Sequence, residues 1–177
     1  SLASLQYGFT VAADWLGFDV SAFFQGTGNH YWYPTGINMA FWGPYGYSYM
    51  SFIPRDFYLD KCWTADHTDA YFPRPRAYSS TGGYLSLAND RYLQNLRYLR
   101  LKNLSVGYTV PQTLTRKAAI DKIRIYFSGE NLCYWSPLKK VCKVVDPELA
   151  NASGTKGDGS FGIGYLYPRT LSLGIDI

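Results

Sequence analysis

The sequence predicts an all-β protein, and more narrowly an antiparallel segment of a transmembrane β-barrel. Three observations support this prediction. The chain of 177 residues is 18% aromatic and only 17% charged, whereas soluble domains usually carry about 25% charged residues. Five stretches of roughly ten residues alternate between apolar and polar side chains, as strands do. The connections between these stretches are alternately short and long, which is typical of outer-membrane barrels.

The composition excludes three other classes of protein. Disordered chains contain few aromatic residues, and this chain contains 17 Tyr, 10 Phe and 5 Trp. The sequence has no run of about 18 apolar residues, so it contains no candidate transmembrane helix. Three cysteines are too few for a disulfide-rich scaffold. The net charge of +4 comes with no recognised nucleic-acid-binding motif, and we therefore expect no nucleic-acid partner.

The first two predicted strands span residues 4–14 and 17–26. Every second residue is apolar along Leu5–Val11, and the same holds along Phe18–Phe24. The alternation breaks only at Trp15–Gly17. We therefore expect two paired strands that are joined by a tight turn.

A long loop is predicted for residues 27–95. No sustained period of two or 3.6 appears there, and Gly and Pro interrupt the segment repeatedly. The stretch between Asp19 and Arg55 contains no charged side chain. Loops longer than about 15 residues are uncommon in compact domains without a functional reason. This loop is therefore the first place to look for a binding function.

Three more strands are predicted at residues 96–110, 121–133 and 166–177, with a second long loop at 134–165. In the first of these strands the apolar positions change phase near Lys102–Asn103. A slip of one residue inside a strand is the signature of a β-bulge. We therefore predict a bulge at this place.

Five strands cannot close a membrane barrel, because the smallest known ones have eight. An open edge in lipid would leave backbone groups unpaired at a cost of several kcal/mol each. We therefore expect the chain to be the end of a larger barrel. If the short turns face the periplasm, the long loops are extracellular and the C-terminus is periplasmic.

The sequence also resembles the SusC/RagA family of TonB-linked outer-membrane transporters. The resemblance is close from Arg97 onward and loose from Gly26 to Tyr92. Its motifs occur in the family's order: Gly17–Ser21 with Phe24–Gly26, Pro73–Arg74, Tyr98–Leu104, Gly107–Pro111, Ile123–Leu132, Asp146–Glu148, Tyr167–Thr170 and Leu173–Gly174. One departure is that members of the family usually end on an aromatic residue, whereas this chain ends on Ile177.

The resemblance implies that residues 1–177 are the C-terminal part of a plugged barrel of about 22 strands. The plug domain and the TonB box of such proteins lie upstream of these residues. Such transporters lie in the outer membrane of Gram-negative bacteria and pair with a SusD-like surface lipoprotein. TonB drives their import of oligosaccharides or peptides.

Two alternatives remain open at this stage. One is a soluble all-β carbohydrate-binding module, which the aromatic loop would suit. The other is a siderophore- or cobalamin-type TonB-dependent receptor that has no lipoprotein lid.

The aromatic residues of the first long loop are candidates for contact with a substrate or a partner. They lie in the charge-free segment and are Tyr31, Trp32, Tyr33, Trp42, Tyr45 and Tyr47. Rings with a polar group suit sugar stacking and protein contact. The alternative is that these rings pack against one another and make the loop rigid.

Basic residues are expected on the face of the sheet that lines the barrel lumen. Arg100, Lys102 and Arg124 point away from the Leu and Ile residues that should face lipid. They either guide an anionic substrate or pair with carboxylates of the plug and neighbouring strands.

We expect no enzyme activity, no metal site and no cofactor. His30 and His67 have no companions at metal-ligand spacing, and Asp66–Asp69 is typical of a solvated turn. No nucleophile elbow occurs, and Gly154–Gly159 lacks the phosphate-loop pattern. A disulfide between Cys133 and Cys142 is left open, because spacing alone does not determine geometry.

Overall fold

The computed structural model describes residues 5–48, 61–116, 120–150 and 167–177. These residues form two compact units. The first, which we call the sheet unit, consists of residues 5–30, 97–116, 120–136 and 167–177. The second, which we call the loop unit, consists of residues 31–48, 61–96 and 137–150. Each unit is described separately.

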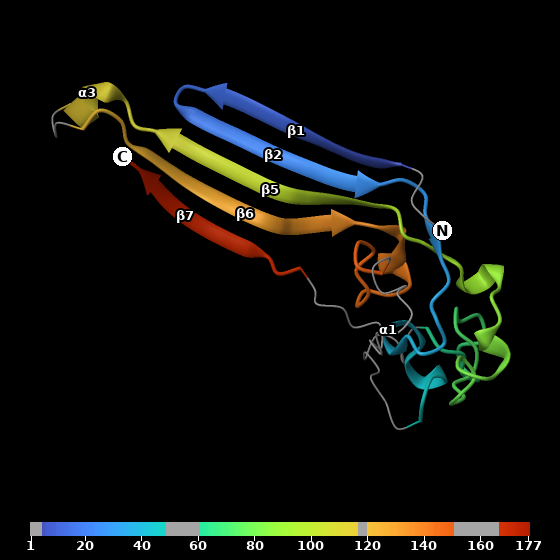
Figure 1. Ribbon diagram of the computed structural model, residues 1–177. Coiled ribbons are helices and arrows are strands. Elements are labelled where there is room, and N and C mark those ends of the chain that lie inside the picture. The colour runs from blue at the N-terminus through green and yellow to red at the C-terminus, as the bar shows by residue number, and fades with distance from the viewer. Residues whose placement is uncertain (1–4, 49–60, 117–119, 151–166) are drawn as a thin grey trace. The chain divides into compact units, whose positions relative to one another are not determined.

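The sheet unit contains one antiparallel sheet with the strand order β1-β2-β5-β6-β7, drawn side by side in Figure 1. The strands are β1 (Gln6–Trp15), β2 (Phe18–Thr27), β5 (Tyr98–Thr109), β6 (Arg124–Trp135) and β7 (Thr170–Asp176). The short helix α3 (Gln112–Thr115) follows β5. The five long strands expected from the alternation are therefore present, although β6 begins three residues later and β7 four residues later than expected.

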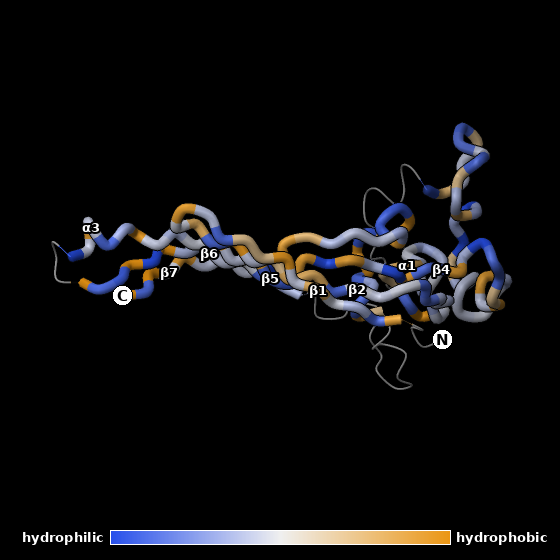
Figure 2. The backbone as a smooth tube through the Cα atoms, turned by 90° about the horizontal axis from the view of Figure 1, so that it is seen from above, coloured by the Kyte–Doolittle hydropathy of each residue, from blue (hydrophilic) through white to orange (hydrophobic). Residues whose placement is uncertain are grey.

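The pairing register places apolar residues of all five strands on one face. Phe9 of β1 pairs with Phe24 of β2, which pairs with Leu101 of β5. Nearer the other end of the sheet, Val106 pairs with Phe127 of β6, and Phe127 pairs with Leu173 of β7. Cross-strand partners share a face. Figure 2 shows hydrophobic and hydrophilic stretches that follow one another along the tube of the sheet. One face is therefore almost wholly apolar and the other carries the polar side chains.

The bulge predicted in the third long strand is confirmed at Lys102. Leu101 pairs with Phe24 and Asn103 pairs with Phe23, so Lys102 has no partner of its own on β2. The register with β6 shifts at the same point. A single extra residue on β5 moves the apolar positions from 99 and 101 to 104, 106 and 108, and it thereby keeps them on one face.

The turn between β1 and β2 has two residues, as the break in the alternation predicted. Leu16 and Gly17 have φ angles of 47° and 87°. Two consecutive positive φ angles match the right-handed twist of a hairpin, as in a type I′ turn. A side chain at position 17 would also approach the carbonyl oxygen of Thr109 to 3.0 Å.

The apolar face is exposed in this chain. Phe9 and Val11 of β1 are 46% and 56% exposed, and Leu173 of β7 is 77% exposed. Continuous apolar surface of this kind marks a membrane or protein contact. β1 and β7 each have one neighbour in the sheet, so the described sheet is open at both edges. No helix among the described residues has the length and hydrophobicity needed to span a membrane.

The loop unit consists of short elements. The first long connection contributes β3 (Tyr31–Trp32), α1 (Met39–Trp42), η1 (Gly43–Tyr45), η2 (Tyr84–Ser86), η3 (Asp90–Tyr92) and β4 (Gln94–Asn95), and the second contributes η5 (Pro137–Lys140). β3 and β4 pair antiparallel. The sequence showed no period in these segments because each of these elements is two to four residues long.

Aromatic rings form the core of the loop unit. Phe41, Trp42, Tyr45 and Phe72 have no exposed surface. The ring of Phe72 lies 5.5 Å from that of Phe41 and 5.7 Å from those of Tyr45 and Tyr92. Such edge and stacked contacts add to the free energy gained from burial. The core therefore stabilises a segment that has little regular secondary structure.

The two long connections share this core. Leu138, Cys142 and Val145 of the second connection belong to the same buried cluster as the rings of the first. The Lys61 ammonium donates a hydrogen bond to the carbonyl of Val141, and the Cys142 thiol donates to the carbonyl of Ala40 at 3.3 Å. No pattern in the sequence indicated that the two loops fold together.

Replacing Phe72 with Ala should unfold the loop unit and leave the sheet intact. Removal of a fully buried Phe typically costs about 3–5 kcal/mol, and five rings contact this one. We expect faster proteolytic cleavage within residues 61–96 of the full-length protein, with an unchanged difference in gel mobility between the heated and the unheated protein. Leu87→Ala, at a site that is 72% exposed, is the control. Equal cleavage of both variants would contradict the proposed core.

Candidate functional site

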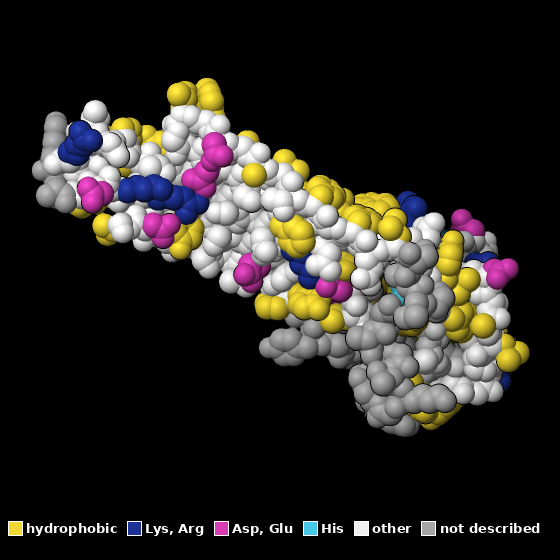
Figure 3. Space-filling view, turned by 45° about the horizontal axis from the view of Figure 1, so that its top comes forward, with side chains coloured by type: hydrophobic (Ala, Val, Ile, Leu, Met, Phe, Trp, Pro, Cys, Tyr) yellow, Lys and Arg dark blue, Asp and Glu magenta, His cyan; other side chains and the backbone are white. Residues whose placement is uncertain are grey.

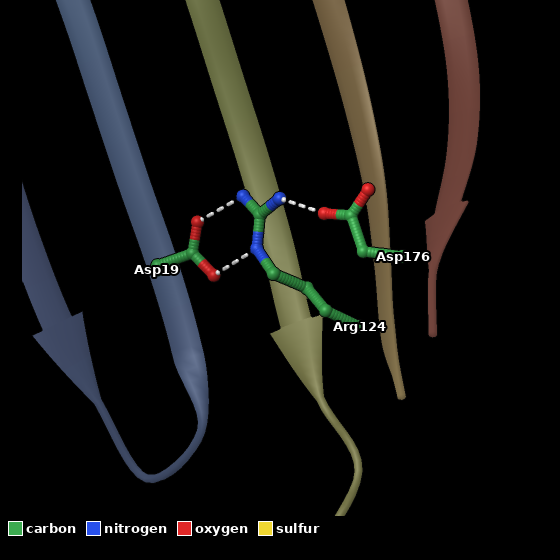
Figure 4. Close-up of polar contacts among 3 residues, drawn as sticks. All are labelled: Asp19, Arg124 and Asp176. Carbon is green, nitrogen blue, oxygen red and sulfur yellow. Dashed lines mark hydrogen bonds and ion pairs between the residues drawn. The ribbon is translucent and has the colours of Figure 1, made fainter. Parts of the chain in front are cut away.

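The polar face of the sheet carries an ion cluster centred on Arg124. Its Nε donates to Asp19 Oδ1 at 2.9 Å and its Nη2 donates to Asp19 Oδ2 at 2.6 Å. Its Nη1 donates to Asp176 Oδ2 at 3.1 Å. Figure 4 shows this fork between the two carboxylates. The bidentate geometry fixes the orientation of the guanidinium, in addition to the attraction between the opposite charges.

The pair of Arg124 and Asp19 connects two strands that are not neighbours. Asp19 lies on β2 and Arg124 on β6, so the ion pair crosses β5 at Gly107. A Cβ atom at Gly107 would lie 2.5 Å from Asp19 Oδ1 and 2.6 Å from Arg124 Nη2. Gly107 therefore provides the space through which the pair forms. Acidic and basic side chains gather at the same end of the sheet as α3 in Figure 3.

Arg100 and Lys102 form a second group with tyrosine rings. The Arg100 guanidinium lies 4.7 Å from the ring centroid of Tyr134 and 5.3 Å from that of Tyr167. The Lys102 ammonium lies 4.5 Å from the same Tyr167 ring. Cations are attracted to the electron-rich faces of such rings. Arg100 is only 2% exposed, so within the described residues its charge is largely covered.

The three predicted basic residues are thus divided between two groups. Arg124 pairs with Asp176 of the neighbouring strand β7 and with Asp19 of β2, and pairing with carboxylates is one of the two roles considered for these residues. Arg100 and Lys102 share a tyrosine ring at the bulge. That all three line a lumen stays a prediction. Sequence reasoning missed Asp19 and Asp176 as partners of Arg124, although both occupy polar positions of alternating strands.

The six candidate aromatic residues are also divided. Trp42 and Tyr45 are fully buried, and their polar groups bond within the unit: Trp42 Nε1 donates to the carbonyl of Pro34 at 3.2 Å, and Tyr45 OH donates to that of Pro73. Burial raises the pKa of Tyr45. Their rings belong to the core, so they offer no surface to a ligand.

The other four candidates lie partly or wholly at the surface. Tyr31 is 50% exposed, and Trp32 packs edge-on against Phe41 at 6.1 Å. Tyr33 OH donates to the carbonyls of Leu85 and Leu87, each at 2.9 Å. The ring of Tyr47 lies edge-on to that of Tyr78 at 6.1 Å. Direct contact with a substrate or partner stays a prediction for these four residues.

The Cys133–Cys142 disulfide is not formed, and all three cysteines are free thiols. Cys133 is exposed on β6, whereas Cys142 is buried in the core of the loop unit, where burial raises the pKa of its thiol. His67 Nε2 lies 3.3 Å from Asp69 Oδ1 at the surface. Over the described ranges, no group of three or more potential metal ligands comes together.

Comparison with known proteins identifies relatives of this arrangement. No protein-family model matches the chain. TonB-dependent receptor P26 of Formosa agariphila is 25% identical over 181 residues, which cover 99% of this chain and 17% of that receptor. TonB-dependent receptor P3 of the same organism is 29% identical over 120 residues, or 65% of this chain and 11% of that receptor. The chain thus spans less than a fifth of the length of either relative.

Solved structures of the RagAB peptide importer have a similar fold. The open-open state aligns with a TM-score of 0.54 and 25% sequence identity, covering 81% of this chain and 14% of that one. The closed-closed state gives the same TM-score and identity. Together with the open antiparallel sheet and its single apolar face, these matches show that the chain is similar to TonB-dependent receptors and to the SusC/RagA-like transporter of the RagAB importer.

Proposed function

We propose that this chain forms part of the wall and loop region of a TonB-dependent importer in the outer membrane of a Gram-negative bacterium. The observation that carries the proposal is the sheet with one apolar and one polar face. A barrel wall requires this division, because one face meets lipid and the other faces a polar lumen. The relatives, a pair of TonB-dependent receptors and a peptide importer, support the same function.

The whole transporter needs further strands. The outer edges of β1 and β7 carry no neighbouring strand in the described sheet, and lipid cannot satisfy free backbone groups. We propose that residues 1–177 are the C-terminal part of a barrel of about 22 strands. In this arrangement a plug and a TonB box precede them in the chain. The long loops are then extracellular and the C-terminus is periplasmic.

We further propose a SusD-like surface lipoprotein as partner and an oligosaccharide or peptide as substrate. RagAB supports the lipoprotein, because its transporter pairs with the SusD-like surface lipoprotein RagB, and it supports a peptide as one of the two substrates, because it imports peptides. TonB supplies the energy through the upstream segment. The protein acts by transport and catalyses no reaction, in keeping with relatives that are receptors and importers.

The exposed apolar face disfavours the soluble carbohydrate-binding module. A soluble domain would have to hide Leu173, which is 77% exposed, and Ile175, which is 62% exposed. The siderophore- or cobalamin-type receptor would have the same barrel. A bound surface lipoprotein would identify the lidded importer, and its absence would favour the other receptor type.

Purification of the full-length protein from its native outer membrane tests the proposal. We expect a detergent-extracted chain of roughly 100 kDa, as about 22 strands and a plug require, together with a bound surface lipoprotein. Deletion of TonB should abolish uptake and leave the complex assembled. A chain that stays soluble without detergent would contradict the barrel, and a barrel without a lipoprotein would favour the other receptor type.

The Arg124 cluster should stabilise the barrel wall, because it joins β2, β6 and β7 on the polar face. In the full-length protein, Asp19→Asn and Arg124→Gln should each lower the unfolding temperature. The double variant should be no less stable than Arg124→Gln alone, since both changes remove the same interaction. The measurement is the gel shift of unheated against heated barrel.

Asp14→Asn is the matched control for this cycle. Asp14 pairs with Asp19 across β1 and β2, and among the described residues it makes no ion pair with Arg124. Its replacement should not lower the unfolding temperature, because it removes a like charge that faces Asp19 and leaves the Arg124 pairs in place. Fully additive effects of Asp19→Asn and Arg124→Gln would contradict the coupling.

A further inference from the structure

The loop unit contains a cleft that none of the sequence motifs indicated. It has a volume of about 590 Å³ and is lined by the turn at residues 76–84 together with Tyr47. Three of its lining side chains are tyrosines, namely Tyr47, Tyr78 and Tyr84, and Arg76 lies beside them. Clefts of about 300–1,000 Å³ are the size at which proteins bind small ligands.

The rings of the cleft differ from the other rings of the unit in their exposure. Tyr78 is 48% exposed and Tyr84 is 53% exposed, whereas Phe41, Trp42 and Phe72 are completely buried. Burial of an aromatic ring contributes strongly to stability. The two exposed rings therefore give up part of that contribution and line the cleft instead.

The backbone holds Tyr78 in place at a cost. Its φ angle is 63°, which is unfavourable for a residue with a large side chain. Two backbone hydrogen bonds maintain this conformation: Tyr78 N donates to the carbonyl of Gly46 at 2.6 Å, and Gly82 N donates to the carbonyl of Tyr78 at 3.1 Å. The hydroxyls of Ser48 and Tyr78 lie 2.9 Å apart and hold the side chain. Strained residues of this kind concentrate at binding sites, where they preorganise the contact surface.

Arg76 gives the cleft a positive charge. Its side chain is exposed, and within the described residues its guanidinium makes no ion pair or hydrogen bond. No Asp or Glu lines the cleft among these residues. An Arg beside open rings can form a bidentate contact with a carboxylate or sulfate of a ligand whose other face stacks on the rings.

We propose that this cleft binds an acidic oligosaccharide, that is, a sugar chain bearing carboxylate or sulfate groups. The C–H faces of a sugar ring pack against tyrosine rings, and its hydroxyls bond to tyrosine and threonine hydroxyls at the edge of the cleft. Ala77 is the only aliphatic residue beyond glycine in the described lining, so the cleft lacks the apolar subsites that peptide side chains fill. The inference rests on the proposed function, because it names the substrate class of the importer.

Calorimetric titration of the full-length complex tests the proposal. The probes are oligogalacturonate, its methyl ester of the same length, a sulfated galactan oligosaccharide and an oligoglutamate peptide. We expect binding of one or both acidic sugars and at least tenfold weaker binding of the methyl ester, since a hydrogen bond to a charged group contributes about 1.5–3 kcal/mol. The two acidic probes distinguish carboxylate from sulfate recognition.

Three variants locate the site. Arg76→Gln should weaken binding of the acidic sugar about tenfold or more, and Tyr84→Ala should weaken it by a similar factor through lost stacking. Arg74→Gln is the matched control, because Arg74 is also exposed and lies outside the cleft lining. The Arg74→Gln variant should bind the acidic sugar with the same affinity as the unaltered protein.

Three results would overturn the proposal. These are equal effects of Arg76→Gln and Arg74→Gln, preferred binding of oligoglutamate, and loss of the lipoprotein in Arg76→Gln with sugar affinity unchanged. If acidic sugars fail to bind while TonB-dependent uptake and the lipoprotein complex persist, the cleft assignment is wrong and the transport function stands. Absence of the uptake and the complex would instead refute the transport function itself.

Discussion

One constraint governs the sheet: a strand that meets lipid on one side must keep every residue of that side apolar along its whole length. Five strands satisfy it together, because their register aligns Phe24, Leu101 and Cys133 at one level and Val106, Phe127 and Leu173 at another. The extra residue at Lys102 preserves this alignment where the alternation of β5 changes phase. Without it, one end of β5 would turn its leucines toward the polar face. The bulge also brings Lys102 to the Tyr167 ring that Arg100 approaches.

A different principle stabilises the connections. They contain almost no regular structure, and an aromatic core takes over the role that backbone ladders have in the sheet. Trp42 and Phe72 are fully buried there, and residues of both long connections contribute to the cluster. A rigid core allows neighbouring rings such as Tyr78 to stay exposed in a fixed orientation. The stability of the loop unit and the fixed position of its exposed rings therefore both depend on the buried aromatic core.

Features that depend on local periodicity could be predicted from the sequence. The strands, the tight turn at Leu16 and Gly17, and the bulge at Lys102 all leave a mark on the order of apolar residues. The cross-strand ion pair did not, because Asp19 and Arg124 meet only through the register of β2, β5 and β6 and the gap at Gly107. Nor does the sequence distinguish a core ring such as Trp42 from an open one such as Tyr84, since elements of three or four residues show no period. Packing in three dimensions decides both.

The most direct test of the account is the accessibility of spin labels placed in turn at each residue of β5 in the full-length protein in lipid. Oxygen partitions into lipid, and a water-soluble nickel chelate does not. The account predicts high oxygen accessibility at residues 99, 101, 104, 106 and 108, with the alternation changing phase across Lys102 as the pairing requires. Alternation in a single phase through Lys102, or access of the nickel chelate to the apolar positions, would contradict a bulged strand in a barrel wall.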